Sequence, residues 1–513
     1  MEKELLPTLK LSFEMTKTLS NIEYNGLKVN LDTLAQIKVD YENEMEQLEI
    51  VINQLAQEAM GDTPINLASP DDRSMLLYSR KVTDKKMWAQ SFNIGHEMRG
   101  STSKPKMRKR VSSTQMKQMI RNMTEVVYKT QGFHCHSCKG TGRFSPLKKD
   151  GTQGKALRIC KQCDGKGVIY KSTGKVAGFK LVPRNVHDIA SAGFKSDKVT
   201  LEERTRELTL EGQAFAKAYI RYNALRTYLS TFVNGMENNV DSEGFIHPEF
   251  MQCVTATGRL SSRNPNFQNM PRGSTFEIRK VVESRFDGGW ILEGDYSQLE
   301  FRVAGFLGKD KAVYEDVTNE VDVHSYTASV IGCSRQEAKA HTFKPLYGGV
   351  TGTADQQRYY RAFKEKYDGI KKWHEQLQYD AVHKKQVTLP SGRAYAFPDT
   401  KWTEWGTATN RTAICNYPVQ GFATADLLPT ALVRLDNSMV NHNLKSVICN
   451  TVHDSIVVDV HPDEKDICIK LMAEAMKALP EETEKRYGIA YDMPVGIELK
   501  IGKNWLDLDV VSV

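Results

Sequence analysis

The sequence of 513 residues has no apolar run of about eighteen residues, so it offers no candidate membrane-spanning helix. Its start, Met1 to Leu5, lacks the basic flank and apolar stretch of a secretion signal, and we expect a cytoplasmic protein without a membrane partner. Nine cysteines without such a signal argue against a disulfide framework. What remains is a globular chain, 40% apolar and long enough for about three domains.

Acidic residues are scarce in one segment. The formal net charge of +7 is small for this length, but Ser101 to Thr130 contains eight basic side chains and the single acid Glu125. The basic residues are Lys104, Lys106, Arg108, Lys109, Arg110, Lys117, Arg121 and Lys129. Such a segment would attract a phosphate backbone in a salt-dependent way, and a flexible solvated loop is an equal alternative.

The pattern of apolar residues divides the chain. Pro7 to about Ala59 reads as helices, and residues 66–72 form a turn that starts another helix. From about Val82 to Phe194 the sequence is rich in Gly, Lys and Ser, as an inserted module would be. A capping box at Thr200–Glu203 predicts the start of a long helix that runs to about Val233. The remainder alternates short strands with helices, which is typical of an α+β domain.

Two aspartates stand where apolar strands stop. Trp290 to Leu292 leads into Asp295, and residues 447–449 and 456–458 flank Asp454 like the arms of a hairpin. An aspartate at a strand end is more often only a turn residue. Brought together, however, two such carboxylates suit Mg²⁺, and two of these ions support in-line phosphoryl transfer.

Several sequence blocks occur in a fixed order around these aspartates. They are Thr257–Ser262 with Pro265–Pro271, Asp295–Glu300, Arg335–Gly349, Asn416–Gly421, His453–Asp454 and Gly502–Trp505. Together they resemble the polymerase domain of the family A DNA polymerases, and the resemblance covers the chain outside its central insertion. It implies a right-hand α+β fold with an antiparallel palm sheet, helical fingers and a helical thumb.

The resemblance implies the following division of the chain. Residues 1–65 are the N-terminal helical part, 66–240 the thumb with a basic and zinc-binding insertion at 100–180, 241–315 and 401–513 the palm, and 316–400 the fingers.

By the same resemblance, Asp295 and Asp454 are the catalytic residues that bind two Mg²⁺ ions, with help from the backbone carbonyl of Tyr296. A primer 3′-hydroxyl would attack the α-phosphate of a dNTP and release pyrophosphate. The family usually has a glutamate where this chain has Ser455, which concerns a third carboxylate rather than the two-ion mechanism.

Arg335, Lys339 and Phe343 are spaced by four, so a helix would place them on one face. An ordinary surface helix is the alternative reading, but the resemblance makes this the nucleotide-binding helix of the fingers. Arg335 and Lys339 would hold the triphosphate, Phe343 would lie by the sugar and base, and Tyr347 would sit at the helix end. Proline in Lys344–Pro345 predicts a kink just after Phe343.

Sugar selection follows from the resemblance as well. Glu300 would line the ribose pocket with Tyr347 and exclude a 2′-hydroxyl, so deoxynucleotides are expected. Phe343, which lacks the hydroxyl of tyrosine, would disfavour dideoxynucleotides. His324 matches a family histidine near the triphosphate.

Four polar residues match family positions that contact the duplex near the primer terminus. They are Arg259, Asn416, Gln420 and His453. Polar side chains in the minor groove reach acceptors that all base pairs share, so they test pair shape without reading sequence. The family arginine before this Asn block falls at Thr412, and Arg411, one residue early, receives no role.

Two cysteine pairs, Cys135-x2-Cys138 and Cys160-x2-Cys163, are separated by 21 residues. Four thiolates at this spacing predict one closed structural Zn²⁺ site, and a redox role is the second reading. Each pair continues as Cys-x-Gly-x-Gly, similar to the zinc repeats of J-domain co-chaperones. We expect this module and the basic segment before it to bind duplex DNA or a processivity factor.

No acidic exonuclease constellation is visible, so proofreading would be absent or supplied by a separate subunit. The compact layout and the Asn-Tyr-Pro-Val-Gln block at 416–420 point to phage or mobile-element replication. Primer–template DNA and dNTPs are the expected partners. The alternatives are a single-subunit RNA polymerase, and a zinc-dependent nucleic-acid-binding module on an inactive palm.

Overall fold

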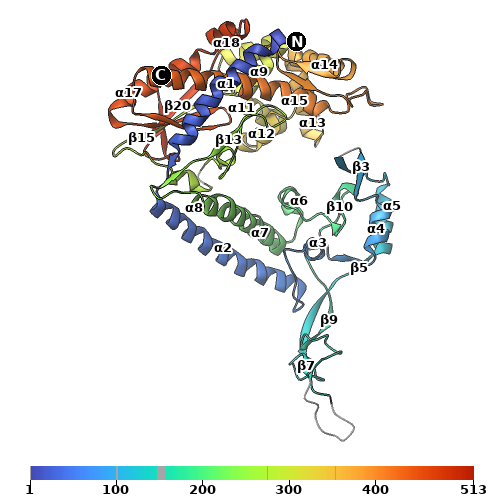
Figure 1. Cartoon of the computed structure of the whole chain (residues 1–513). Helices are drawn as coiled ribbons and strands as arrows, with labels where there is room; N and C mark the ends of the chain where they lie inside the picture. The colour runs from blue at the N-terminus through green and yellow to red at the C-terminus, as the bar shows by residue number, and fades with distance from the viewer. Residues whose placement is uncertain are drawn as a thin grey trace. The chain divides into compact units, whose positions relative to one another are not determined.

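The computed structural model describes residues 2–99, 102–146, 157–273, 275–349, 351–352 and 354–512. These residues form two compact units (Figure 1). Unit 1 comprises residues 1–38 and 230–513, and unit 2 comprises residues 39–229. Among the residues described, no helix is both long and apolar enough to cross a bilayer.

Unit 1 is built on a five-stranded antiparallel sheet with the order β18-β19-β15-β20-β21. Its strands are β15 (Trp290–Tyr296), β18 (Val447–Val452), β19 (Ser455–Val460), β20 (Ile497–Gly502) and β21 (Leu508–Val511). Every residue of β19 is buried, as the apolar run in the sequence requires. The predicted strand before Asp295 and the predicted hairpin around Asp454 are confirmed.

Helices cover this sheet (Figure 1). The N-terminal helix α1 (Glu2–Asn25) packs against β18 and α16 (Leu428–Asn441), and α17 (Lys465–Lys477) packs against α16, β15 and β20. Side chains from α1, the sheet and these helices form one continuous hydrophobic core. This packing fixes the strand ends that carry the two aspartates.

A second group of helices in unit 1 lies between β15 and β18 in the sequence. It contains α9 (Leu299–Gly308), α10 (Lys311–Thr318), α11 (Val323–Ile331), α12 (Arg335–Thr342), α13 (Ala354–Lys366), α14 (Asp368–His383) and α15 (Arg411–Gly421). Helix α11 packs against α12 and α13, and α14 packs against α9 and α15. The aromatic residues Phe301, Tyr359, Phe363 and Tyr367 stack edge to face between these helices and join them to the common core.

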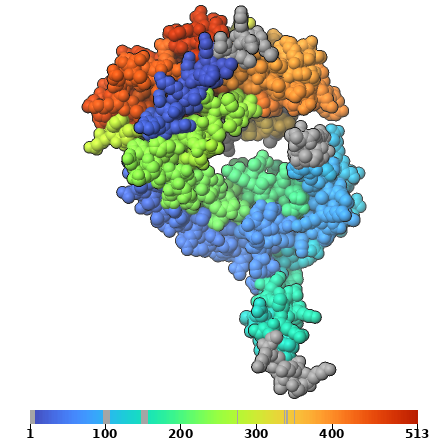
Figure 2. Space-filling view, viewed as in Figure 1, coloured from blue at the N-terminus to red at the C-terminus, as the bar shows by residue number. Residues whose placement is uncertain are grey.

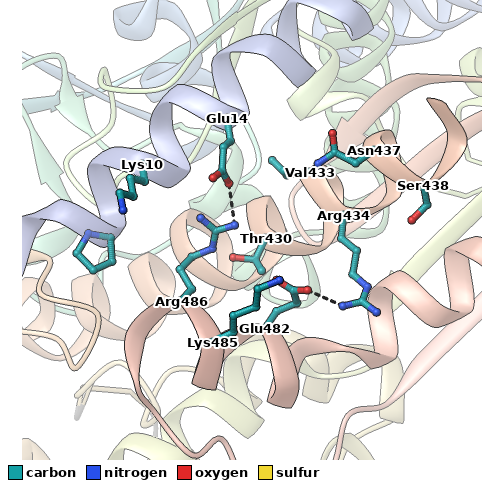
Figure 3. A pocket seen from close by; sticks show the side chains of 11 residues that line it. Lys10, Glu14, Thr430, Val433, Arg434, Asn437, Ser438, Glu482, Lys485 and Arg486 are labelled. Atoms are coloured by element: carbon teal, nitrogen blue, oxygen red, sulfur yellow. Dashed lines mark hydrogen bonds and ion pairs between the residues drawn. The ribbon is translucent and has the colours of Figure 1, made fainter. Parts of the chain in front are cut away.

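The outer face of α1 is fixed by ion pairs (Figure 3). Glu14 on α1 pairs with Arg486 on α18 (Leu479–Tyr487) at 2.7 Å, and Arg434 on α16 pairs with Glu482 on α18. The three helices enclose a cavity of about 590 Å³ lined by these charged side chains. The Glu14–Arg486 pair therefore holds α1 to a helix more than 400 residues away in the chain, and the Arg434–Glu482 pair joins α16 to that helix.

Unit 2 combines helices with short two-stranded sheets. Its elements are α2 (Leu31–Met60, shared with unit 1), α3 (Pro70–Tyr78), β2 (Arg80–Val82), α4 (Lys85–Ser91), β3 (His96–Arg99), β4 (Thr102–Pro105), α5 (Ser113–Met123), β5 (Thr124–Val126), β6 (Tyr128–His134), β7 (Arg143–Phe144), β8 (Arg158–Ile159), β9 (Val168–Val176), β10 (Ile189–Ala190), β11 (Gly193–Phe194), α6 (Lys198–Arg204) and α7 (Leu210–Tyr228). Strand β2 pairs with β5, and β6 pairs with β9. Ser69 caps α3 with Pro70 in its first turn, as the turn at 66–72 predicts.

The core of unit 2 includes residues from both sides of the expected insertion and from within it. Trp88, Ile120 and Phe179 are buried in the same cluster as Leu76 and Phe215. The β6–β9 ribbon, with the cysteines at its far end, projects from this core (Figure 1 and Figure 2). The segment 100–180 is thus not a separate insertion as a whole, because its first part completes the core of the unit.

The helix expected from Thr200 to Val233 is interrupted. Helix α6 begins earlier, capped by Asp197, whose carboxylate accepts a hydrogen bond from the Thr200 amide. It gives way to a 3-10 turn after Arg204, and Thr209 then caps α7. Asp197 and Thr209 are better placed as caps than Thr200, so the predicted start at the Thr200 box is wrong.

The boundaries of the units also differ from the expected domains. The expected thumb begins at residue 66 and ends at 240, whereas unit 2 begins at Val39, inside α2, and ends at Leu229. A continuous helix carries no compositional break, which explains why the sequence does not mark the first boundary.

Candidate active site

The two aspartates meet at one end of the sheet of unit 1. Asp295 pairs across the sheet with Ser455, and the amide of Tyr296 donates a hydrogen bond to the carbonyl of Asp454 at 3.2 Å. His453 and Asp454 form the two-residue turn between β18 and β19, where His453 adopts a left-handed φ of 57°. The turn therefore holds Asp454 next to the end of β15, beside Asp295.

The guanidinium of Arg272 lies between the two carboxylates. Nη1 of Arg272 is 2.8 Å from Oδ2 of Asp295, and its Nη2 is 3.9 Å from Oδ1 of Asp454. Sequence reasoning missed Arg272, although it directly follows the family-like block Pro265–Pro271. Nothing in the sequence distinguishes it from an ordinary loop arginine, because its partners are distant in the chain.

The electrostatics of the pair favour a divalent cation. Burial and the neighbouring charge of Asp295 raise the pKa of Asp454 to about 7, and Arg272 only partly offsets both effects. Hard oxygen ligands that repel one another in this way fit Mg²⁺. The side chain of Tyr296 is buried and its hydroxyl donates to the carbonyl of Met476, so only the main chain of Tyr296 is left for the site.

Arg259 and Glu300 form an ion pair near this centre. Nη2 of Arg259 is 2.7 Å from Oε1 of Glu300, which lies in the first turn of α9. Burial raises the pKa of Glu300, and the charge of Arg259 only partly offsets this rise. Nε of Arg259 also donates to Oγ1 of Thr424 at 3.3 Å. The pair fixes both side chains between α9 and the helical segment that follows Gln420.

Gln268 clamps the turn that carries Asp454. Its side-chain amide donates to the carbonyl of Thr451, and its Oε1 accepts a hydrogen bond from the amide of His453 at 3.2 Å. Gln268 also belongs to the block Pro265–Pro271, but the sequence alone assigns it no role. Its glutamine side chain has both a donor and an acceptor, and only the folded chain shows that both are used here.

His453 shares a narrow cleft with Arg259 and Gln268. Burial, followed by the charges of Arg259, Arg272 and Arg279, lowers the pKa of His453 to about 4. The imidazole is therefore neutral at pH 7, and it can accept or donate one hydrogen bond without adding charge to the cleft.

Asn416 and Gln420 lie four residues apart on α15 and so share one face of the helix. The helix continues into a π-helical segment, Phe422–Leu427, in which the Thr424 hydroxyl donates to the carbonyl of Gln420. Through Thr424 this segment reaches Arg259. The structure thus connects the four predicted DNA-contacting residues through α15 and the small cleft.

The predicted nucleotide-binding residues are spread over several elements. Glu300 lies in α9 and His324 in α11, and the others lie in α12 or just after it. Nε of Arg335 pairs with Asp322, and this contact lowers the pKa of the Asp322 carboxyl although burial opposes the shift. Nδ1 of His324 lies 3.0 Å from Oγ1 of Thr342, and the His324 ring stands perpendicular to the Phe343 ring at 5.4 Å. The side chain of Lys339 is outside the described part of the structure.

The prediction that Phe343 lies on the same helix as Arg335 is wrong. Helix α12 ends at Thr342, and residues 343–348 form a series of turns. Pro345 has no amide to donate and disfavours helical backbone at Lys344, so the helix stops before Phe343 rather than bending after it. The amide of Tyr347 still bonds to the carbonyl of Phe343, and their rings are 6.4 Å apart.

The four paired cysteines form a second cluster, in unit 2. Their ligand atoms all lie within 4.8 Å of one another, and all four residues are buried. Gly142 donates its amide to Sγ of Cys138 at 3.3 Å, and Gly167 donates to Sγ of Cys163 at 3.2 Å. Both glycines have φ above 70°, which a residue with a side chain rarely adopts. The two Cys-x2-Cys-x-Gly-x-Gly repeats thus form equivalent knuckles, and their thiol set fits tetrahedral Zn²⁺.

Residues 180–507 match the model of DNA polymerase family A. The match covers more than half of the chain and includes both aspartates, and the chain belongs to this family. Among similar proteins, DNA polymerase I of Lactococcus lactis subsp. cremoris is 31% identical over 312 residues, which cover 56% of this chain and 34% of that protein. DNA polymerase I of Pseudomonas aeruginosa is 30% identical over 60% of this chain and 35% of its own length.

The chain spans about a third of the length of these relatives. A solved structure, the POL domain of Pol1 from M. smegmatis in complex with DNA primer-template and dNTP, matches with a TM-score of 0.63. The match covers 96% of this chain and 70% of that domain at 20% identity. It shows that the two share a fold.

Proposed function

We propose that the chain is a DNA-directed DNA polymerase that adds dNTPs to the 3′-hydroxyl of a primer paired with a template. The observation that carries this proposal is that Asp295 and Asp454 meet at one end of the sheet in a family A chain, with the guanidinium of Arg272 between them. The relatives are named DNA polymerase I, and the solved neighbour binds primer-template and dNTP, which supports the choice of substrates.

Asp295, Asp454 and the backbone carbonyl of Tyr296 would hold two Mg²⁺ ions. When bound, the ions activate the primer hydroxyl and neutralise charge on the phosphates. Arg272 must leave its position between the carboxylates for this, and it then becomes a free cation beside the triphosphate. Gln268 keeps the Asp454 turn in place during that exchange.

The fingers would bind the incoming nucleotide. Arg335 and Lys339 hold the triphosphate, with His324 nearby. Phe343 lies by the sugar and base, and Tyr347 lines the ribose pocket with Glu300. Glu300, fixed by Arg259, fills the space that a 2′-hydroxyl would need, so dNTPs are preferred over rNTPs. Asn416, Gln420, Arg259 and the neutral His453 contact the newly formed base pair.

Unit 1 would then supply the palm, with β15, β18 and β19, and the fingers, with α10 to α14. Unit 2 would be the thumb. We propose one structural Zn²⁺ in the cysteine cluster, and a role for the β6–β9 ribbon and the basic segment in binding duplex DNA or a processivity factor. Replication of a phage or mobile element is the proposed context.

Primer extension by the purified protein tests the proposal. Extension should require Mg²⁺ and proceed with dNTPs, and Asp295→Asn or Asp454→Asn should slow it by at least about 10²- to 10³-fold, as losing a preorganised electrostatic contact does. DNA binding should change little in either variant. Asp287→Asn is the matched control, because Asp287 is exposed and precedes the opposite end of β15.

The other candidate functions give different results in the same assay. Extension with rNTPs in preference to dNTPs would identify an RNA polymerase. DNA binding without extension would identify a binding module on an inactive palm. Normal extension by either Asn variant would refute the assigned catalytic pair.

A further inference from the structure

Unit 2 has a groove of about 670 Å³ with an apolar floor and a basic rim. Its floor contains Ile120, Val126 and Leu181, and the exposed side chain of Val182 stands at its edge. Four cations line it: Arg80, Lys117, Arg121 and Lys180. Among the described residues that line the groove there is no carboxylate.

Helix α5 supplies half of this charge. Lys117 and Arg121 are four residues apart, so they project from one side of the helix. Met116 and Ile120 bury the adjacent side in the core of the unit, which fixes the orientation of α5. The basic segment seen in the sequence therefore contributes two of its cations to a defined groove.

The opposite wall is also rigid. Nε of Arg80 on β2 donates to Oγ1 of Thr124 at 2.6 Å, which holds the guanidinium at the groove. Thr124 and Val126 both line the groove from β5. Glu125 lies between them, and since successive residues of a strand point to opposite faces, its carboxylate is directed away from the groove.

The apolar floor and the basic rim together distinguish between two classes of ligand, a nucleic acid and an acidic peptide. A phosphate backbone binds through charge and needs no apolar floor, and protein–DNA interfaces are polar. A peptide fits better when a large apolar side chain enters the groove and flanking carboxylates meet the four cations. We propose that the groove is a docking site for an acidic segment of a partner protein that carries aliphatic or aromatic anchor residues.

The proposal extends the proposed role of unit 2 by naming the chemistry of its partner. Its test does not use polymerase activity, so it can fail while primer extension succeeds, and the reverse. The full-length protein would be used to select from a displayed library of short random peptides, and the enriched consensus peptide would then be measured by fluorescence anisotropy.

Charge reversal locates the binding site. Lys117→Glu and Arg121→Glu should each weaken the consensus peptide at least about tenfold. Val182→Ser should weaken it without changing charge, since Val182 is 64% exposed and its loss leaves the core intact. Lys217→Glu is the control, because Lys217 is an exposed lysine of α7 outside the groove.

The proposal predicts enriched peptides that combine Asp or Glu with large apolar residues and lose affinity in the groove variants alone. It is overturned if the Lys117→Glu protein enriches the same peptides equally, or if the enriched peptides lack acidic residues. It is equally overturned if a short DNA duplex displaces the peptide and is itself weakened by the groove substitutions, because the groove would then bind DNA.

Discussion

Asp454 is half-buried beside a second carboxylate, and its negative charge therefore opposes folding in the absence of metal. Its pKa is about 7 in the folded protein, against an ordinary value of 3.8, because of burial first and the charge of Asp295 second. The folded state thus binds this proton more tightly than the unfolded state. The stabilising effect of the proton is complete below about pH 4 and is lost as the pH rises through about 7.

We therefore expect Asp454→Asn to stabilise the metal-free protein while it abolishes extension. The gain in the free energy of unfolding of unit 1 should be small near pH 4, grow towards pH 7 and level off at about 1 to 2 kcal/mol above it. Chemical unfolding in Mg²⁺-free buffer without chelator measures this and leaves the cysteine cluster undisturbed. Asp287→Asn should show no such pH dependence, and equal stability of wild type and Asp454→Asn at pH 8 would contradict the burial argument.

The positions of the two aspartates, at the ends of strands, could be predicted from the sequence because the signals around them are local. Each follows or precedes an apolar strand, and the family blocks give their order. Arg272 and Gln268 could not be assigned in this way. Arg272 contacts one carboxylate from β15 and one from the β18–β19 turn, and Gln268 bonds to backbone atoms about 180 residues away, so their roles exist only after folding.

At the scale of elements, the sequence predicts an element correctly where a local signal, such as a capping residue or an apolar run, determines the backbone conformation. Pro70 and Ser69 mark the start of α3, and the two apolar runs around Asp454 mark the β18–β19 hairpin. The end of α12 was misplaced because proline ends a helix or kinks it, and the packing around Phe343 decides which. The start of α6 was misplaced because Asp197 and Thr200 are both acceptable caps, and the choice depends on the turn before them.

The spacing of the four cysteines in the sequence and the clustering of their thiols in the structure both favour a zinc site. We expect one Zn²⁺ per chain by elemental analysis, and its loss in a Cys135→Ala, Cys138→Ala double variant. The ribbon should then become sensitive to protease between β6 and β9, because the buried cluster of the two knuckles consists of the four cysteines themselves, with Ile169 packed against them. The core of unit 2 should unfold as before, since its buried residues do not include the ribbon tip.

Cys253→Ala is the control for this experiment, because Cys253 is exposed and outside the cluster. It should retain zinc and protease resistance. A double cysteine variant that still binds one Zn²⁺ would refute the assigned ligand set.

At the scale of the whole molecule, unit 1 contains a five-stranded antiparallel sheet, and unit 2 is composed differently from the expected thumb with an insertion. Unit 2 forms one core from α2 to α7, and the ribbon stands outside it. Removing the whole segment 100–175 would also remove Met116 and Ile120 from that core. Such a deletion would unfold the unit and say nothing about processivity.

The register of the ribbon offers a cleaner deletion. Gly132 pairs with Tyr170, so residues 133–169 can be replaced by an Asn-Gly turn that closes the shortened ribbon as a hairpin. If the ribbon holds the enzyme on duplex DNA or on a partner bound to it, the truncated protein should add a single nucleotide at the wild-type rate. It should nevertheless release longer primers early, and the loss should grow with salt, because contacts to phosphates weaken as counterions compete. Product lengths under single-hit conditions at two salt concentrations measure this effect. Because single-nucleotide addition serves as the internal control, product lengths equal to wild type at both salts would show that the ribbon has no part in processive synthesis.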